Sequence, residues 1–398
     1  MKTNVAVFFG GVSVEHEVSI ISAVQAMHSM NTEKYNIIPI YITKDGIMLY
    51  GDKLNDIETF RRPSLNTLKD EFIKVIVARD GDSVYIYNQK AGFKGRKPLT
   101  TIDIAFPIVH GTNVEDGALS GWFELLGIPY VGCDVLSAAV GMDKAIFKDV
   151  LNSAGVPVLP HIAFFSKRWS SEKDEIIAQI EKTFDYPVIV KPANLGSSVG
   201  ISKAKDRRSL EEAVDLATSF AQKILVERAV TSLREINCSV LGDMDECNPS
   251  ECEEPVMTGE ILSYNDKYIS DSSASKGMQT LKRKLPADLS AEKAAEIKNY
   301  ACRTFKAMGC NGVVRIDFLI DTADGDKVYV NEANTIPGSL AFYLWEATGK
   351  KYTELLDDMI ALGFKRDRAK KQLMFTYDTN ILDGVGSFGT KGAKGSKF

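Results

Sequence analysis

Residues 188–201, VIVKPANLGSSVGI, join two short apolar runs through a turn rich in glycine and serine. The residue order differs from the GxxxxGK[ST] of a P-loop, and a second strand-like run stands where a P-loop has a helix. The stretch therefore predicts two neighbouring strands that hold a glycine-rich loop between them. Lys191 precedes this loop, where backbone N–H groups and the hydroxyls of Ser197 and Ser198 could help it bind a phosphate.

The composition is that of a globular protein. The chain has 398 residues, of which 44% are hydrophobic and 25% are charged, which is enough for two or three domains with cores of their own. Its net charge of -5 argues against a nucleic-acid partner, which usually requires a basic surface. No apolar run approaches the length of a membrane span, and the amino terminus carries no export signal. We expect a cytoplasmic protein whose six scattered cysteines are free thiols rather than a zinc site.

The first part of the chain alternates strands and helices. Apolar runs at 4–11 and 35–43 flank a helical pattern at 18–30, which predicts a βαβ unit and hence a doubly wound parallel sheet. The same pattern continues with a strand expected at 101–111 and helices expected at 117–127 and 143–155, the last of which Asp143 could cap.

After residue 156 the pattern changes, and short strands around a helix at 209–221 predict an α+β arrangement. The acidic, proline-containing segment 243–256 is expected to be an exposed insertion. The clearest helix signal of the chain lies at 289–309, where apolar positions repeat with helical spacing. The tail at 387–398 is rich in glycine and lysine and is expected to be flexible.

The segment 313–334 is the most informative about chemistry, because two strand-like runs flank the turn TADGD and predict an antiparallel hairpin. Side chains alternate along a strand, so Arg315 and Asp317 share one face. Glu332 and Asn334 share a face for the same reason. Two carboxylates and an amide oxygen suit Mg²⁺ bound to phosphates, and the arginine could stabilise developing charge. The alternative is a solvated sheet face, which the position of these polar residues in an apolar strand argues against.

Two lysines and two glutamates could complete a nucleotide site. Lys144 and Lys191 would each alone be ordinary surface residues, but the glycine-rich loop and the carboxylates favour a phosphate site. Glu227 ends a buried strand, where backbone groups could bind adenine. Glu235 could bind ribose hydroxyls, although a simple surface carboxylate is the default interpretation.

The glycine turn at 10–11 leads into Glu15 at the start of a helix. A carboxylate there could bind a substrate ammonium group, or it could be the acidic residue that helix N-termini favour. Both interpretations stay open at this point. His110, in VHGTNVEDG, could equally be a packed histidine or a ligand.

Six segments of the chain resemble motifs of the D-alanine–D-alanine ligase family, in order and at similar spacing. They are FGGVSVEHEVS, VHGTNVEDGALSGWFELLGIPYVG, MDKAIFKDVL, YPVIVKPANLGSSVG, RIDF and NEANTIPG, and the resemblance spans residues 4 to about 362. It implies the ATP-grasp fold, of mixed α/β and α+β class, and a homodimer. The implied domains are 1–105 (N-terminal substrate domain), 106–230 (central ATP-grasp subdomain), 231–370 (C-terminal catalytic domain) and a tail at 371–398.

The resemblance also implies roles for individual residues. Lys144, Lys191 and Ser197 would contact the ATP phosphates, Glu227 and Val230 the adenine, and Glu235 the ribose. Asp317, Glu332 and Asn334 would bind two Mg²⁺ ions, for which Mn²⁺ could substitute. Glu15 would bind the ammonium group of the first amino acid, Ser198, Lys267 and Tyr268 would close over the substrates, and Arg315 with the backbone of Gly338 would stabilise the tetrahedral species.

The implied reaction forms an acyl phosphate from the first amino acid and ATP, which the amine of the second amino acid then attacks. One segment departs from the family pattern: 339–349 reads SLAFYLWEATG, with Tyr343 near the position of a family serine that grips the second substrate's carboxylate. The acceptor could therefore be D-alanine, D-serine, D-lactate or another amino acid, in peptidoglycan precursor synthesis. An ATP-grasp ligase for other amino acids, and a relative that binds nucleotide or amino acid without turnover, remain alternatives.

Overall fold

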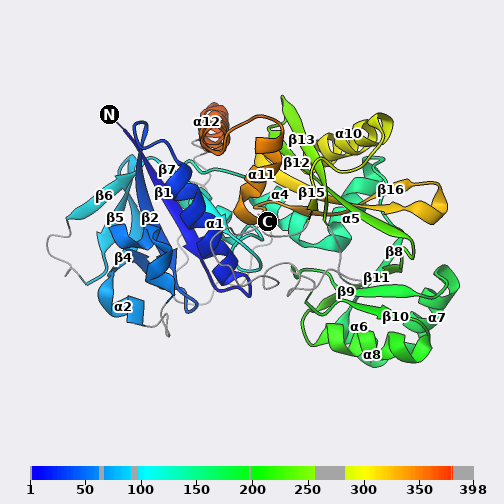
Figure 1. The fold of residues 1–398 in the computed structure, drawn as a ribbon. Helices are drawn as coiled ribbons and strands as arrows, with labels where there is room; N and C mark the ends of the chain where they lie inside the picture. The colour runs from blue at the N-terminus through cyan, green and yellow to red at the C-terminus, as the bar shows by residue number, and fades with distance from the viewer. Residues whose placement is uncertain are drawn as a thin grey trace, which may run out of the picture.

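The computed structural model describes residues 2–61, 67–90, 97–196, 199–255, 283–377 and 379. Its strands form three sheets that follow one another along the chain (Figure 1). The first sheet has seven strands in the order β6-β5-β4-β3-β2-β1-β7. They are β1 (Thr3–Gly10), β2 (Tyr35–Ile42), β3 (Met48–Tyr50), β4 (Ile73–Asp80), β5 (Ser83–Asn88), β6 (Pro98–Ile102) and β7 (Ile104–Val109).

Strands β2, β1 and β7 pair in parallel, as the sequence predicts, and the other four strands continue the sheet antiparallel, so the sheet is mixed. Val5 and Phe9 of β1 pack with α1 (His16–Ser29). Phe8, on the opposite face, packs with α3 (Ala118–Leu126). Both faces of β1 are therefore covered, which explains its unbroken apolar run. The short helices η1 (Asp52–Asn55), η2 (Ile57–Phe60) and α2 (Leu68–Glu71) lie between β3 and β4.

The second sheet is antiparallel throughout, in the order β10-β9-β11-β8. Its strands are β8 (His161–Phe165), β9 (Val188–Pro192), β10 (Ser202–Ala204) and β11 (Lys223–Arg228). Helices α6 (Ser166–Ser171), α7 (Lys173–Thr183) and α8 (Arg207–Thr218) cover one of its faces (Figure 1). Val188 and Val190 belong to the core under these helices. Side chains alternate along a strand, so Ile189 and Lys191 lie on the opposite face.

The third sheet is also antiparallel, in the order β14-β13-β12-β15-β16. Its strands are β12 (Leu233–Gly242), β13 (Cys247–Pro255), β14 (Arg283–Lys284), β15 (Gly312–Asp321) and β16 (Lys327–Asn334). Three helices share its core, namely α4 (Val135–Met142), α5 (Lys144–Ser153) and α10 (Ala291–Ala307). Asp143 caps α5, as predicted, and Ser290 caps α10. The predicted hairpin at 313–334 is confirmed, because β15 and β16 pair across the short helix η5 (Thr322–Asp324).

The segment 243–256 is not the exposed insertion that its acidity suggests. Most of it is β13, which pairs with β12 along the third sheet, and its Cys252 is buried. Acidic side chains are tolerated there because basic ones pair with them, as Lys298 does with Glu251 at 2.9 Å. Pro249 also fits, because β14 pairs only with the far end of β13 and leaves Pro249 at a sheet edge. The prediction was wrong because it treated both features as loop signals.

The last described elements return to the first sheet. They are η6 (Gly338–Ala341), α11 (Phe342–Ala347) and α12 (Tyr352–Lys370). Side chains of α11 and α12 share one core with β1 and β7. No helix among the described residues is long and apolar enough to cross a membrane. The six cysteines are free thiols, and the expectation for the tail at 387–398 falls outside the described residues.

Candidate functional site

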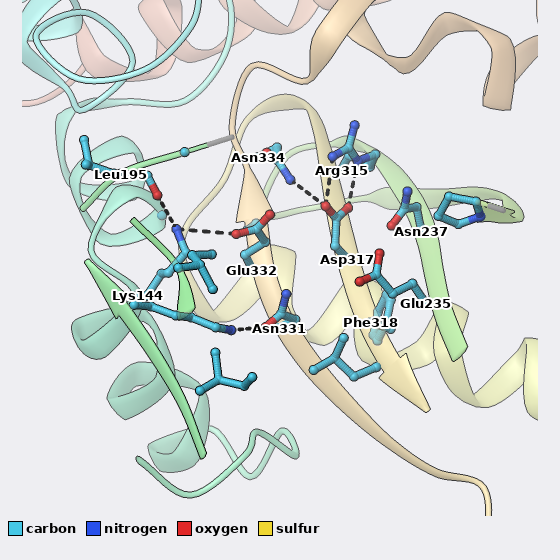
Figure 2. Close-up of a pocket in the computed structure, with 18 of the residues that line it drawn as sticks. Lys144, Leu195, Glu235, Asn237, Arg315, Asp317, Phe318, Asn331, Glu332 and Asn334 are labelled. Atoms are coloured by element: carbon cyan, nitrogen blue, oxygen red, sulfur yellow. Dashed lines mark hydrogen bonds and ion pairs between the residues drawn. The ribbon is translucent and has the colours of Figure 1, made fainter. Parts of the chain in front are cut away.

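A cleft lies between the second and third sheets, and residues from all three parts of the chain line it. Figure 2 shows the two walls, with Lys144 and Leu195 on one side and the residues of β12, β15 and β16 on the other. Eleven of the fifteen residues that the sequence singles out line this cleft: Glu15, Lys144, Lys191, Glu227, Val230, Glu235, Arg315, Asp317, Glu332, Asn334 and Gly338. The other four, Ser197, Ser198, Lys267 and Tyr268, lie outside the described residues.

The hairpin places its polar side chains on one surface. In the β15–β16 register Arg315 lies opposite Asn334, and Asp317 lies opposite Glu332. The Arg315 guanidinium donates to both oxygens of Asp317, with Nε–Oδ1 at 2.7 Å and Nη2–Oδ2 at 2.8 Å. Asn334 Nδ2 donates to Asp317 Oδ2 at 3.1 Å (Figure 2). The predicted convergence of these four side chains is therefore present.

Lys144 faces this hairpin from the opposite wall. It is the first residue of α5, and Asp143 caps the helix by accepting hydrogen bonds from the backbone N–H groups of Ala145 and Ile146. The Lys144 ammonium donates to the carbonyl oxygen of Leu195 at 2.8 Å and lies 3.4 Å from Glu332 Oε2. The lysine thus spans from the glycine-rich loop to the hairpin, where a phosphate chain would lie.

Lys191 and Glu227 belong to a buried charge cluster that includes Lys148, which the sequence analysis did not identify. Lys148 Nζ lies 2.9 Å from Glu227 Oε2, and both side chains are 1% exposed. Lys191 also pairs with Glu227 and donates to Asn331 Oδ1 at 3.2 Å. Burial raises the pKa of Glu227, but Lys148 and Lys191 outweigh it and hold the pKa at about 2. The signal for Lys148 was its position, one helical turn after Lys144.

One end of the cleft is apolar. Leu159, Ile189, Val230 and Leu319 line it, and Glu235 stands at its edge on β12. Val230 packs against Leu159 and Leu319. A narrow apolar slot beside a carboxylate suits a nucleobase and its ribose. The carboxylate of Glu227 is committed to its lysines, so any contact of Glu227 with adenine would use backbone groups at the end of β11.

Glu15 reaches the glycine-rich loop from the first part of the chain. A Cβ atom added at Gly196 would lie 3.0 Å from Glu15 Oε2, so the carboxylate lies directly against this loop. Glu115, which the sequence analysis did not identify, accepts hydrogen bonds from the backbone N–H groups of Gly111 at 2.9 Å and Ile336 at 3.0 Å. Burial and the charge of Glu15 raise the pKa of Glu115 to about 7.

His110, for which two interpretations were open, is a packed histidine with partners on both ring nitrogens. Nδ1 lies 2.8 Å from the carbonyl oxygen of Ile336, and Nε2 lies 3.0 Å from Ser22 Oγ. Burial lowers its pKa to about 4. The neutral ring connects β7 and α1 to the segment before Gly338, so it helps to set the position of that segment.

Beside Asp317, on the neighbouring strands of the third sheet, lies a second polar cluster, formed by Arg283, Glu253, Tyr343 and Asn237 and called here the Arg283 cluster. Glu253 Oε1 accepts hydrogen bonds from the Tyr343 hydroxyl at 2.8 Å and from Asn237 Nδ2 at 3.0 Å. Glu253 Oε2 accepts from Arg283 Nη1 at 2.9 Å. The Arg283 guanidinium lies 4.1 Å from the centroid of the Tyr343 ring. Tyr343 is thus buried as a support and is not a hydroxyl presented to the cleft.

The donor set of the hairpin fits magnesium better than a metal held by protein alone. Among the described residues, no three or more His, Cys, Asp or Glu side chains gather so as to hold a metal ion. Asp317 and Glu332 instead offer two carboxylates on paired strands, with the Asn334 amide beside them. Magnesium is usually bound by one or two carboxylates together with substrate phosphates, so this smaller set is sufficient when ATP is bound.

Two family models match most of the chain. The family model described as D-ala D-ala ligase N-terminus matches residues 4–133, and that described as D-ala D-ala ligase C-terminus matches residues 150–361. A protein of Caldicellulosiruptor bescii named D-alanine–D-alanine ligase is 43% identical over 389 residues, covering 94% of this chain and 99% of the relative. A protein of Thermosipho melanesiensis with the same name is 40% identical over 380 residues, covering 95% of this chain and 98% of the relative.

Solved structures give the same result. The D-alanine–D-alanine ligase from Coxiella burnetii is similar with a TM-score of 0.74 at 30% identity, over 93% of this chain and 96% of that one. The VanG D-Ala:D-Ser ligase from Enterococcus faecalis also has a TM-score of 0.74 at 30% identity, over 91% of this chain and 100% of that one. The three sheets described above therefore have the arrangement of these ligases, the ATP-grasp fold.

Proposed function

This chain belongs to the D-alanine–D-alanine ligase family, and we propose that it is an ATP-dependent ligase that joins D-alanine to a second amino acid for peptidoglycan precursors, releasing ADP and phosphate. D-Alanine is our first choice of acceptor, because the two relatives described above are named for it. D-Serine is the second, because a structural neighbour is named for it.

The observation that carries the proposal is the convergence of opposite charges across the cleft. Lys144 lies 3.4 Å from Glu332, directly across from the Arg315–Asp317 pair on the same hairpin. A carboxylate is a poor acyl donor and repels a triphosphate, so a ligase must hold both anions together. Lysines on one wall and an arginine with metal-binding carboxylates on the other supply that function.

Each group of residues in the cleft has its own role in the proposed reaction. Lys144 and Lys191 hold the phosphates, the apolar slot at Val230 holds the base, and Glu15 holds the ammonium group of the first amino acid. The carboxylate of that amino acid is thereby directed at the γ-phosphate, and their reaction gives an acyl phosphate and ADP. Arg315 and the backbone of Gly338 face the carbonyl that the second amine attacks, so they stabilise the oxyanion of that step. Phosphate then leaves.

Magnesium would be held by Asp317, Glu332 and Asn334, where it neutralises phosphate charge. We propose two ions, and we expect Mn²⁺ to substitute because it accepts the same oxygen ligands. Water must be kept from the acyl phosphate. By resemblance to the family, Ser198, Lys267 and Tyr268 are proposed to close over the substrates, and Ser197 is proposed to contact the phosphates.

Location and assembly are part of the same proposal. A reaction that consumes ATP and supplies precursors for the cell wall belongs in the cytoplasm, where ATP is made. We also propose a homodimer, by resemblance to the family. The mass of the protein in solution, from light scattering after size-exclusion chromatography, should be twice the chain mass of 43.8 kDa.

The test is ATP-dependent condensation of amino acids by the purified protein. We expect ADP and phosphate release that requires both amino acids, with a dipeptide detected by mass spectrometry, in a pairwise screen of D- and L-amino acids. Glu332→Gln should reduce turnover by about 100-fold or more, because it removes a metal-binding carboxylate. The matched control is Asp324→Asn, on the exposed turn of the same hairpin, which should keep full activity. Phosphate release without a dipeptide, or binding without turnover, would contradict the proposal.

A further inference from the structure

We propose that Arg283 binds the carboxylate of the second amino acid and so selects acceptors that carry one. The inference rests on the proposed function and assigns a residue to the choice of acceptor. Arg283 lines the same cleft as Arg315 and Gly338, the two groups that face the reacting carbonyl. The side chain of Arg283 is 11% exposed, so its guanidinium is largely withdrawn from solvent.

An amino-acid acceptor brings a carboxylate to the part of the cleft that holds the reacting carbonyl. The acceptor amine must reach the acyl carbon, and in an amino acid the carboxylate is one carbon atom away from that amine. In the proposed function Arg315 already faces the oxyanion, and it also donates two hydrogen bonds to Asp317. Lys144 and Lys191 lie at the phosphate end, and Arg228 pairs with Asp321 at 2.8 Å. Lys203, the remaining lysine of the described lining, lies on β10 of the second sheet, opposite Ile189. Arg283 instead belongs to the wall that carries the hairpin, because its partner Glu253 bonds to Asn237, which lies opposite Asp317 in the β12–β15 register.

Three neighbours fix the position of the Arg283 guanidinium. Glu253 accepts a hydrogen bond from Nη1, and its other oxygen accepts from Tyr343 and Asn237, so the carboxylate cannot rotate away. The Tyr343 ring lies under the guanidinium, where cation–π attraction holds its plane. A planar guanidinium with five N–H donors can serve two carboxylates at once. Glu253 and Tyr343 are therefore positioning residues, and Arg283 is the one that meets the substrate.

The backbone just before α11 has an unusual conformation that sets the position of Tyr343. Ser339, Leu340 and Ala341 have φ values of 51°, 53° and 49°, a left-handed conformation that non-glycine residues avoid. Hydrogen bonds hold it in place, because Ser339 N donates to Ser22 Oγ at 2.9 Å and Ser339 Oγ donates to Gln25 Oε1 at 2.6 Å. This turn leads directly from Gly338 into α11, and it places Tyr343 beside Glu253. Backbone strain of this kind is usually found at functional sites.

Glu253 could instead recognise a cationic side chain of the acceptor. Its geometry argues against this role, because both of its oxygens accept hydrogen bonds from protein donors. Its side chain is 4% exposed, compared with 11% for that of Arg283. The structure therefore favours an acceptor that brings a carboxylate to Arg283 over one that brings a cation to Glu253.

The test is a competition between two acceptors, D-alanine and D-alaninamide, with ATP and D-alanine as donor. D-Alaninamide has no carboxylate, so it can act only as an acceptor. We expect the wild type to prefer D-alanine, and Arg283→Met to reduce this preference about 10- to 100-fold, the effect of losing one charged hydrogen bond. Arg283→Lys should restore part of the preference, and the KM for ATP should be unchanged in all three proteins. An unchanged product ratio in Arg283→Met would overturn the inference.

Two further variants separate this role from a structural one. Arg283→Met leaves the buried carboxylate of Glu253 without its cation, which could destabilise the protein. The double variant R283M/E253Q removes both charges, and its preference between the two acceptors is measured if the single variant is unstable. Lys284→Met removes the neighbouring charge on the same strand and should keep the wild-type preference. If the wild type forms no dipeptide, the proposed function has failed. If the wild type is active and Arg283→Met or R283M/E253Q discriminates like it, only the inference has failed.

Discussion

Glu227 is a buried anion shared by two lysines, and the three charges do not balance. The cluster holds Lys148, Lys191 and one carboxylate, so its formal charge is positive. A buried excess of positive charge is costly unless an anion is near, and the phosphates of a nucleotide would be that anion. The arrangement explains why the pKa of Glu227 is held at about 2, because deprotonation is what allows two lysines to be buried together.

Glu227→Gln should therefore be more destabilising than the loss of one lysine. The substitution leaves Lys148 and Lys191 buried together without a counter-charge, and we expect it to lower the free energy of unfolding by about 3–5 kcal/mol. Adding Lys148→Met to this variant removes one of the two like charges and should restore part of the loss. Urea denaturation of the wild type, the single variants and the double variant measures the free energy of unfolding. A double variant less stable than Glu227→Gln alone would contradict the interpretation.

Under the proposed function, Glu115 should make the binding of the first amino acid depend on pH. Its pKa is raised to about 7, first by burial and then by Glu15, so below that pH it is neutral and above it the pair carries two negative charges. An ammonium group binds better to the doubly charged pair, and kcat/KM for the first amino acid should rise from about pH 6 to about pH 8. The free energy of unfolding should change in the opposite direction. Because the pKa of Glu115 is raised in the folded state, its ionisation destabilises that state as the pH rises toward about 7.

Glu115→Gln should remove the inflection near neutral pH, because Gln does not titrate. The measurement is kcat/KM for D-alanine as donor against pH, in wild type and variant, under saturating ATP. Glu292→Gln, on the first turn of α10, changes one carboxylate away from the cleft and should leave the profile unchanged. A profile in Glu115→Gln with the wild-type inflection would assign the titration to another group.

Among the elements, α5 shows how a helix start positions a side chain of the proposed phosphate site. Asp143 caps the helix with one oxygen and pairs with Lys223 through the other, and Lys144 follows directly. Asp143→Ala should cost about 1–2 kcal/mol of stability and raise the KM for ATP, since Lys144 loses its fixed helix start. Asp143→Asn keeps an N-cap oxygen and should retain most of the stability and most of the affinity for ATP. Denaturation and ATP kinetics test the pair, and equal effects of the two substitutions would argue against capping.

The cap and the hairpin could be predicted because their signals are local. Asp143 precedes a periodic apolar pattern, and the alternation along 313–334 fixes which side chains share a face. The Arg283 cluster could not be predicted in this way, because its members come from β12, β13, β14 and α11 and meet only through sheet pairing. The role of Glu253 could not be predicted either, because the acidic, proline-containing stretch around it is typical of an exposed loop. The pairing of Lys148 with Glu227 depends equally on tertiary packing.

At the scale of the whole molecule, three sheets follow one another along the chain and the cleft lies where they meet (Figure 1). We propose the three domains expected from the sequence, 1–105, 106–230 and 231–370. The first sheet includes β7 and so extends to Val109, past the expected boundary at 105. The boundary at 230 falls between β11 and β12. Residues from separate sheets therefore line one cleft, and a ligand that contacts them couples its binding energy to the relative position of the sheets.

A nucleotide that contacts both walls should therefore stabilise the whole molecule, and magnesium should add to the effect only through the hairpin. We expect a non-hydrolysable ATP analogue with Mg²⁺, at about 100 times its dissociation constant, to stabilise the protein by about 2.7 kcal/mol, seen as a rise of several degrees in Tm. Removing Mg²⁺ with a chelator should reduce this rise, because Asp317 and Glu332 then face the phosphates without a bridging cation. In Glu332→Gln the analogue should still raise Tm, since Lys144 and Lys191 remain, but the increment from Mg²⁺ should be lost. A full Mg²⁺ increment in that variant would place the metal elsewhere and remove the hairpin from the proposed site.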